Sequence, residues 1–571
     1  MINVLEQKMK IPTEVSPYGE VPNHRQIEWY RREKSIFFHF GINTYTNREW
    51  GDGTDDPKLF NPANLDCRQW VKEIKDAGFT TAILTAKHHD GFCLWPSKYT
   101  EYSVKNSPYK DGKGDIVKEF TDACSEFGIK AGLYLSPWDR HEPTWGTEAY
   151  NDFYVNQIEE IFNNYGKIWE CWWDGAGSTI AKYDYERWVK TVRKCQPDAV
   201  IFGSLGATPY VDVRWVGNEN GIAGKPCWAT VEEIALLEEI NEKLNTGKAD
   251  GERFIPAEVD VSIRPGWFYH QEQDNQVRSP ENLLKLWFSS VGSNAGLLLN
   301  IPPNRDGLLH ESDIKSLKRF NEMLTEGFKC NIAEKAEISA NSFLDEKYSV
   351  TNILNKNYDE FYVSGNDCVT PEIVFEFQSE IEFNTFVLDE AIEYGHKIRG
   401  FELCAFVDND WVSVWQGECV GYRCAEHFDS ITTKKVKLKI TKAVDSPIIR
   451  FFGLYNVNQD WFKVENARFS NENIMRNGLA FVEREDDCFD VNLGGVIPFN
   501  KIIFEGDKIQ DYELYIFDGS KYILYKSEEN ADKERIECLF SGTVDWAYKF
   551  RIKVLKKKKE IEHLKIEVYF N

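Results

Sequence analysis

The chain has 571 residues, of which 42% are hydrophobic and 14% aromatic, so it is long enough for several folded domains and too apolar for a disordered protein. Its formal net charge of −24 disfavours nucleic acid and anionic membranes as partners and suits a neutral substrate. The 13 cysteines include no Cys-x-x-Cys pair, which argues against the common zinc and redox motifs and predicts reduced thiols. Because no apolar stretch could cross a bilayer and no signal peptide is visible, we expect a cytoplasmic protein without membrane insertion. The alternative is a secreted protein whose leader is not part of this sequence.

Short apolar runs alternate with amphipathic helical patterns over the first part of the chain. The runs that we interpret as buried parallel strands are residues 35–40, 81–85, 130–135, 168–173, 200–202, 213–215, 254–261 and 296–300. Helical spacing between most of them covers residues 68–77, 116–127, 151–165, 185–194 and 282–290. Eight β-α units predict a closed (β/α)8 barrel, and we assign it to residues 1–335 as a catalytic domain.

After about residue 333 the helical spacing gives way to alternating apolar and polar residues, which is typical of half-buried antiparallel strands. Motifs in this region repeat in order: residues 383–386 resemble 499–502, residues 401–408 resemble 512–518, and residues 436–440 resemble 550–554. We therefore predict two β-sandwiches, a carbohydrate-binding-like domain at residues 336–460 and a second sandwich at 461–571. The alternative is that the two regions resemble each other only because all antiparallel sandwiches alternate apolar and polar residues.

Two carboxylates follow predicted strands and are the candidates for catalysis. Asp174 directly follows the fourth run, and Glu219 comes shortly after the sixth. Barrel enzymes keep their catalytic groups at the carboxyl ends of the strands, so we expect both side chains to face one mouth. Trp172, Trp173 and Trp215 beside them suggest a pocket that stacks on sugar rings. A pair of carboxylates in an aromatic pocket indicates cleavage of a glycosidic bond.

Three histidines occupy the ends of the first two predicted strands. His39 ends the first run, and His88 and His89 follow the second. We interpret them as hydrogen-bond donors to the hydroxyls of one sugar ring. The alternative is a metal site, in which Glu49 and Asp90 would support the histidines. The sequence gives no firm metal site and no cofactor.

Other strand ends carry further candidates for substrate binding. Glu49 and Trp50 follow the first strand, where an acid can hold two hydroxyls while the indole packs on the sugar. Tyr134 ends the third strand, and its phenol either bonds the nucleophile or a hydroxyl, or only packs. Arg264 and Trp267 follow the seventh run, where Arg264 is a substrate contact or balances nearby acids.

Two of those acids compete with Glu219 as the second carboxylate. Glu258 and Asp260 belong to the seventh run, and residues two apart in a strand point the same way.

Taken together, these motifs resemble the α-L-fucosidases of glycoside hydrolase family 29. The likeness extends over about residues 35–307, and its pieces are His-Phe-Gly at 39–41, Glu-Trp at 49–50, Lys-His-His-Asp-Gly-Phe at 87–92, Trp-Trp-Asp-Gly at 172–175 and Leu-Leu-Leu-Asn-Ile-Pro-Pro-Asn at 297–304. The resemblance implies a retaining exo-glycosidase that acts on α-L-fucosides of oligosaccharides or glycoconjugates, with Asp174 as the nucleophile. The implied fucose-binding set is His39, Glu49, Trp50, His88, His89 and Tyr134. The β region resembles galactose-binding-like sandwiches.

The acid/base of this family has no single fixed position. In the branch specific for α-1,3/1,4-fucosyl linkages it lies in a Gly-Asn-Glu element, and here Gly217-Asn218-Glu219 ends 45 residues after Asp174. In the broader branch the acid follows a Trp, whereas here Glu258 follows Ala. The resemblance therefore favours Glu219 and hydrolysis of fucose from Lewis-type branched glycans by double displacement.

Two alternatives stay open. One is a broad-specificity α-L-fucosidase with Glu258 as the acid/base. The other is a carbohydrate-binding protein without turnover, in which Trp411 and Trp415 of the β region anchor glycans.

Overall fold

The computed structural model describes residues 15–177, 182–204, 206–234, 241–355, 357–462, 481–485, 487–493, 499–517, 522–529, 531–544, 549–557 and 564–569. None of the helices in these ranges combines the length and the apolar character needed to span a membrane.

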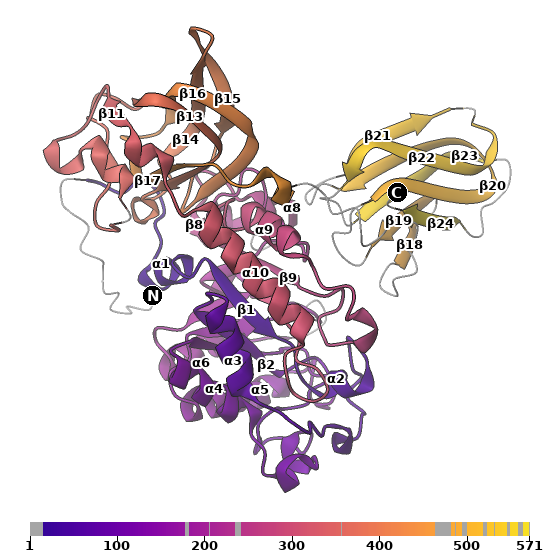
Figure 1. Cartoon of the computed structure of the whole chain (residues 1–571). Coiled ribbons are helices and arrows are strands. Elements are labelled where there is room, and N and C mark those ends of the chain that lie inside the picture. The colour runs from indigo at the N-terminus through magenta and orange to yellow at the C-terminus, as the bar shows by residue number, and fades with distance from the viewer. Residues whose placement is uncertain are drawn as a thin grey trace.

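Eight parallel strands close into a barrel in the first part of the chain (Figure 1). They are β1 (Lys34–Phe38), β2 (Thr81–Lys87), β3 (Lys130–Leu135), β4 (Glu170–Trp173), β5 (Val200–Gly203), β6 (Val213–Trp215), β9 (Ala257–Ser262) and β10 (Gly296–Asn300). Pairing of β1 with β10 closes the ring. Each strand overlaps one predicted run, so the predicted barrel is confirmed.

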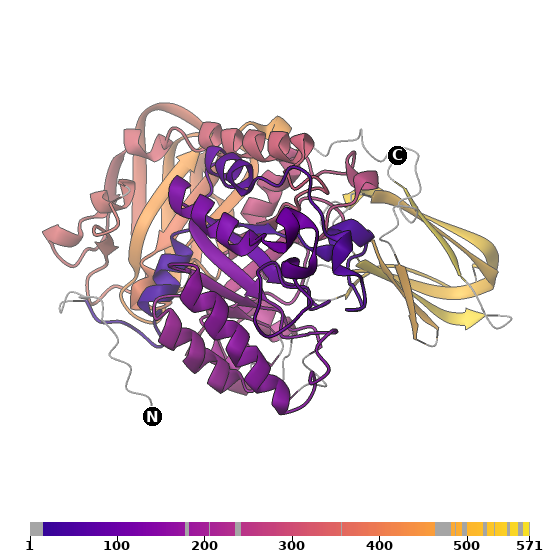
Figure 2. The same ribbon diagram turned by 90° about the horizontal axis from the view of Figure 1, so that it is seen from below.

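Helices surround the barrel, and Figure 2 shows those of the first half, in purple, along its outside. In chain order they are α1 (His24–Tyr30), α2 (Ile42–Thr46), α3 (Cys67–Asp76), α4 (Ile116–Phe127), α5 (Ala149–Asn164), α6 (Tyr185–Cys195), α8 (Asn241–Thr246), α9 (Pro280–Ser289) and α10 (Glu311–Gly327). Helix α3 illustrates why they form. Asp66 caps its first backbone N–H groups, and Cys67, Trp70, Val71 and Ile74 form one buried face at helical spacing.

Two details differ from the predicted β-α units. Among the described residues between β5 and β6, the one helical element is the 3-10 turn Thr208–Tyr210. The connection is too short for an α-helix together with the turns that would join it to both strands. The predicted seventh run also divides. Its first residue belongs to a small sheet formed by β7 (Thr230–Val231) and β8 (Arg253–Phe254), and β9 begins only after Pro256. Proline has no N–H to continue a ladder.

The rest of the chain forms two antiparallel β regions, each with its own apolar core. The first contains β11 (Glu337–Ala340), β12 (Tyr362–Val363), β13 (Glu372–Glu390), β14 (Ile398–Val407), β15 (Asp410–Gly417), β16 (Cys424–Ala443) and β17 (Ile448–Tyr455). The second contains β18 (Phe481–Glu485), β19 (Cys488–Asn492), β20 (Phe499–Phe517), β21 (Tyr522–Glu528), β22 (Lys533–Val544), β23 (Lys549–Lys557) and β24 (Lys565–Tyr569). Figure 1 shows the second region, in yellow, as a separate body.

The repeated motifs have a counterpart in strand pairing. Leu403 pairs with Leu438 between β14 and β16, and Leu514 pairs with Ile552 between β20 and β23. A hairpin to the next strand follows in both regions. The difference is that β20 runs on as one long strand where the first region has two, β13 and β14.

Candidate active site

A cavity of about 290 Å³ opens at the carboxyl ends of the barrel strands. Its lining residues are Phe37, His39, Glu49, Trp50, His88, His89, Trp172, Asp174, Ala176, Ser204, Trp215, Glu219, Asp260 and Trp267. The proposed catalytic pair and the predicted substrate-binding residues are among them, except Tyr134 and Arg264. Trp173 is not in this group because side chains alternate along a strand, and it lies fully buried in the core outside the barrel.

Asp174 follows β4 and is held by three neighbours. Its Oδ1 accepts a hydrogen bond from the backbone N–H of Ala176 at 2.8 Å, and its Oδ2 accepts one from the Tyr134 phenol at 3.3 Å. His89 Nε2 lies 3.7 Å from the same Oδ2. Burial and the charge of Asp174 raise the pKa of Tyr134 well above its usual range, so the phenol remains protonated and donates. Tyr134 therefore contacts the predicted nucleophile and does not line the cavity, which matches one of the three roles considered for it.

Glu219 reaches the cavity from the segment after β6. Its Oε2 accepts a hydrogen bond from Trp267 Nε1 at 3.3 Å, and solvent reaches the side chain only from the cavity mouth. The surrounding cavity walls displace much of its hydration, and this together with the negative charge of Asp174 raises its pKa to about 7, while the Trp267 hydrogen bond opposes that rise. Glu219 therefore holds its proton up to near-neutral pH.

The segment that carries Glu219, residues 217–224, is here called the acid loop. Asn218 closes it internally, because its Nδ2 donates to the Ile222 carbonyl and its Oδ1 accepts from the Asn220 backbone N–H. The Ala223 backbone N–H donates to the Ser289 carbonyl at the end of α9. The loop is thus closed on itself around the acid and anchored to α9 after it.

His39 is held in one tautomer by a chain of amide contacts. Asn300 Nδ2 donates to Ser262 Oγ and to the Trp267 carbonyl, each at 2.8 Å, so its Oδ1 must accept. That oxygen lies 2.9 Å from His39 Nδ1, which must therefore carry the proton. Burial lowers the pKa of His39 to about 3, so the ring is neutral.

The other two histidines are neutral for the same reason. Ser136 Oγ donates to the Trp138 carbonyl at 2.7 Å, and the same oxygen lies 2.8 Å from His89 Nδ1, which therefore donates to it. Burial lowers the pKa of both His88 and His89, and Asp174 partly offsets the effect at His89. The cavity is therefore lined by uncharged imidazoles that can hydrogen-bond sugar hydroxyls.

Glu49 is oriented by a residue that sequence reasoning missed. Its Oε2 accepts from the Trp267 backbone N–H at 2.8 Å, and its Oε1 lies 2.5 Å from His270 Nε2. His270 Nδ1 in turn contacts Asn47 Oδ1 at 3.0 Å. No signal in the sequence identified His270, whereas Asn300 stood inside one of the motifs quoted above, at 297–304.

Within residues 87–92, the two histidines line the cavity, whereas Lys87 and Asp90 make structural contacts. Lys87 is fully buried outside the barrel, where its Nζ contacts Asp139 Oδ2 and Gln157 Oε1, each at 2.8 Å. Asp90 accepts from the Phe92 backbone N–H at 2.7 Å. In the part of the chain that the structure describes, no three His, Cys, Asp or Glu side chains are arranged to hold a metal ion.

Glu258 and Asp260 lie on the inner face of β9 but differ in their surroundings. Both oxygens of Glu258 are occupied, by Trp172 Nε1 at 2.9 Å and by Trp29 Nε1 at 3.2 Å, and the residue does not line the cavity. Asp260 does line it.

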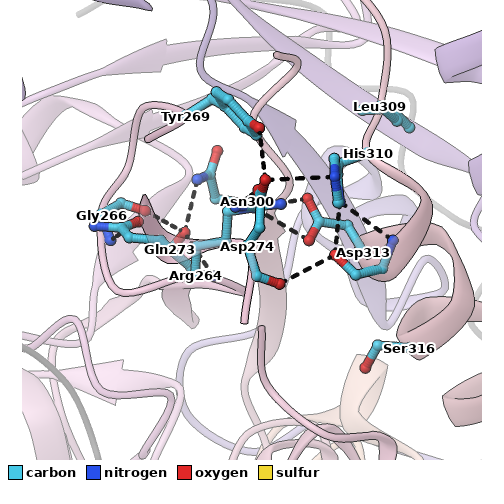
Figure 3. Close-up of polar contacts among 12 residues, drawn as sticks. Arg264, Gly266, Tyr269, Gln273, Asp274, Asn300, Leu309, His310, Asp313 and Ser316 are labelled. Atoms are coloured by element: carbon cyan, nitrogen blue, oxygen red, sulfur yellow. Dashed lines mark hydrogen bonds and ion pairs between the residues drawn. The ribbon is translucent and has the colours of Figure 1, made fainter. Parts of the chain in front are cut away.

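Arg264 does not line the cavity, which corrects the expected substrate contact. Its Nε donates to Asp313 at 2.9 and 3.1 Å, and its Nη1 to Asp274 at 2.9 Å, in a buried cluster beside the start of α10 (Figure 3). It therefore balances these two acids and not Glu258 or Asp260.

Trp411 and Trp415, the candidate glycan anchors of the first β region, are both half-buried. The Lys437 ammonium lies 4.7 Å from the Trp411 ring centre, and the Lys225 ammonium 5.8 Å from that of Trp415. Neither ring is therefore a fully exposed surface on which a sugar could stack.

Comparison with known proteins agrees with this geometry. The family model described as Alpha-L-fucosidase matches residues 18–326, which include the whole barrel. Alpha-L-fucosidase 1 of Arabidopsis thaliana is 39% identical over 77% of this chain and 88% of its own. A solved putative α-L-fucosidase from Bacteroides thetaiotaomicron is 44% identical, with a TM-score of 0.76 over 78% of this chain and 99% of its own. A family 29 member from an unknown rumen bacterium is 31% identical, with a TM-score of 0.71 over 97% of this chain and 100% of its own. The chain therefore belongs to the α-L-fucosidases of glycoside hydrolase family 29.

Proposed function

We propose that this α-L-fucosidase is a retaining exo-enzyme that removes α-1,3/1,4-linked fucose from Lewis-type branched glycans. The observation that carries the proposal is the convergence of Asp174 and Glu219 on one cavity. They come from different strand ends, and Glu219 stands in the Gly-Asn-Glu element of the acid loop.

In this mechanism Asp174 attacks the anomeric carbon of fucose and forms a covalent glycosyl-enzyme, while Glu219 protonates the departing oxygen. Water then enters, Glu219 removes its proton, and fucose leaves. The contacts from Ala176 and Tyr134 keep the Asp174 carboxylate aimed at the sugar. The raised pKa of Glu219 suits the acid of such a pair, whose two members need different proton affinities.

The rest of the cavity suits one deoxyhexose ring. The volume of about 290 Å³ is at the small end for ligand sites, which favours a single terminal sugar. Glu49 and the neutral imidazoles supply hydrogen bonds to hydroxyls. Phe37 and Trp267, whose ring centres are 6.5 Å apart, supply an apolar edge for the 6-methyl group.

The choice of Glu219 over Glu258 supports the linkage-restricted branch. Glu258 has no free oxygen to offer a glycosidic bond, because two indoles occupy its carboxylate below the cavity. The acid loop borders the cavity mouth, where the rest of a branched glycan would lie.

Replacing Asp174 by Gly tests the nucleophile, with Tyr134→Phe as the matched variant that keeps the carboxylate. Activity of Asp174→Gly on an aryl fucoside should fall by orders of magnitude and return with azide as a fucosyl azide, whereas azide should not raise the activity of Tyr134→Phe. Residual activity that azide leaves unchanged would refute the assignment.

A substrate comparison tests the linkage. Fucose release from a Lewis trisaccharide should far exceed release from an unbranched α-1,2-fucoside. Equal rates would favour a broad-specificity enzyme.

A further inference from the structure

The cavity wall contains a further carboxyl group that the proposed mechanism does not use. Asp260 lies on β9, next to β6 in the barrel. The residue lines the cavity, although only 4% of it is exposed. Its Oδ1 accepts a hydrogen bond from Trp215 Nε1 at 2.8 Å. In the described part of the chain no second side chain donates to this carboxyl, and its one further hydrogen bond comes from the backbone N–H of Asp260 itself. Because the residue lines the cavity, its carboxyl borders the space where the sugar would bind.

Glu258, two residues earlier on the same strand face, shows what a purely structural carboxyl looks like here. Both of its oxygens are held by indole N–H groups, and it contributes nothing to the cavity lining. Asp260 has only one such donor. A buried polar group that is not fully hydrogen-bonded costs stability unless a ligand completes it, so a carboxyl with one side-chain donor in the cavity wall points to a function.

We propose that Asp260 is a further fucose-binding residue, whose carboxyl in the cavity wall hydrogen-bonds a hydroxyl of the fucosyl ring. This inference rests on the proposed binding of fucose in this cavity.

The proton on Asp260 defines the kind of hydrogen bond. Burial and the negative charge of Glu219 raise the pKa of Asp260 well above its usual range, with a further contribution from Asp174. Negative charge on Asp260 would be repelled by these neighbouring carboxyl groups. Asp260 is therefore a neutral acid that donates its O–H to a sugar oxygen. It keeps this proton through the reaction, whereas Glu219 exchanges its own.

Competitive inhibition by free fucose measures this contact directly. Asp260→Ala removes it and should raise the inhibition constant of fucose about tenfold, as expected for one lost hydrogen bond. Asp260→Asn keeps both an acceptor for Trp215 and an N–H₂ donor for the sugar. It should therefore raise the inhibition constant of fucose only about two- to threefold. If Asp260→Ala does not fold, Asp260→Ser carries the same prediction, because its hydroxyl is too short to reach the ring.

Glu258→Gln is the matched control on the same strand face. It should lower the melting temperature, because one indole loses its acceptor, and leave the inhibition constant of fucose unchanged. Wild-type inhibition in Asp260→Ala, or an Asn variant as weak as the Ala variant, would overturn the inference. If fucose does not inhibit the wild-type enzyme, the proposed function itself fails and the inference with it. If the activity lost in Asp260→Ala grows as the leaving group of the substrate becomes poorer, Asp260 is the acid, and this result also overturns the inference.

Discussion

Replacement of Glu219 by Gln is the most informative single change, because its effect can be worked out from the geometry around one carboxyl group. The acid must be protonated to act, and its pKa is about 7. Because the pKa is raised, the active protonated form persists through mildly acidic pH and is lost as the pH rises. About nine tenths of the enzyme is active at pH 6 and about one tenth at pH 8, since each unit changes the proton ratio tenfold. We expect kcat/KM for a Lewis trisaccharide to fall about tenfold per pH unit well above 7.

The Gln variant has no proton to give. For the trisaccharide, whose leaving group is a sugar hydroxyl, kcat/KM should drop by about 10²- to 10⁴-fold, and its fall above pH 7 should disappear. For an aryl fucoside with a good leaving group the loss should be far smaller, because that bond breaks with little protonation. The assay is kcat/KM for both substrates from pH 5 to 9, a quantity that reports only steps up to formation of the glycosyl-enzyme.

Glu258→Gln serves as the control for the rival acid and should keep the wild-type pH profile. The reasoning is refuted if Glu219→Gln loses equal activity on both substrates, or if the decline above pH 7 survives in that variant. If Glu258→Gln instead loses much more activity on the trisaccharide than on the aryl fucoside, Glu258 is the acid.

Three further changes test the supporting structure. Lys87→Met leaves Asp139 buried without its cation and should lower the free energy of unfolding by about 3–5 kcal/mol, measured by chemical denaturation. Arg264→Leu should destabilise by a similar amount while KM for an aryl fucoside stays at the wild-type value; a large rise in KM would restore its expected role in binding. Gly221→Ala places a side chain at φ +83° against Leu286 of α9, so we expect a cost of about 1–3 kcal/mol and a lower kcat/KM from a displaced acid loop. An unchanged kcat/KM would show that the loop conformation does not position the acid.

The barrel was predictable because its signals are local. Each strand is a short apolar run, and the position of a residue just beyond a run fixes which end of the barrel it occupies. That is why Asp174, Glu219 and the histidines converge on one cavity as expected. Helical spacing was found between most runs but not between the fifth and sixth, and the structure has only a 3-10 turn in that connection.

Partners far apart in the chain were not predictable. Asn300 fixes the tautomer of His39 from 261 positions away, and His270 contacts Glu49 across 221 positions. Neither periodicity nor spacing carries that information. Arg264 shows the opposite error, since it lies near a strand end in the sequence but its side chain turns outward to Asp313.

The contrast between Glu258 and Asp260 shows how a single backbone pattern gives two different roles. Strand alternation aims both carboxyls into the barrel, where desolvation makes each a poor anion. At Glu258 two indole donors satisfy the group, so the carboxyl joins the barrel packing. At Asp260 only one indole donor is present and the carboxyl lines the cavity, so its remaining hydrogen-bonding capacity is available to the substrate. The residue type alone does not decide between these outcomes; the number of neighbouring N–H groups does.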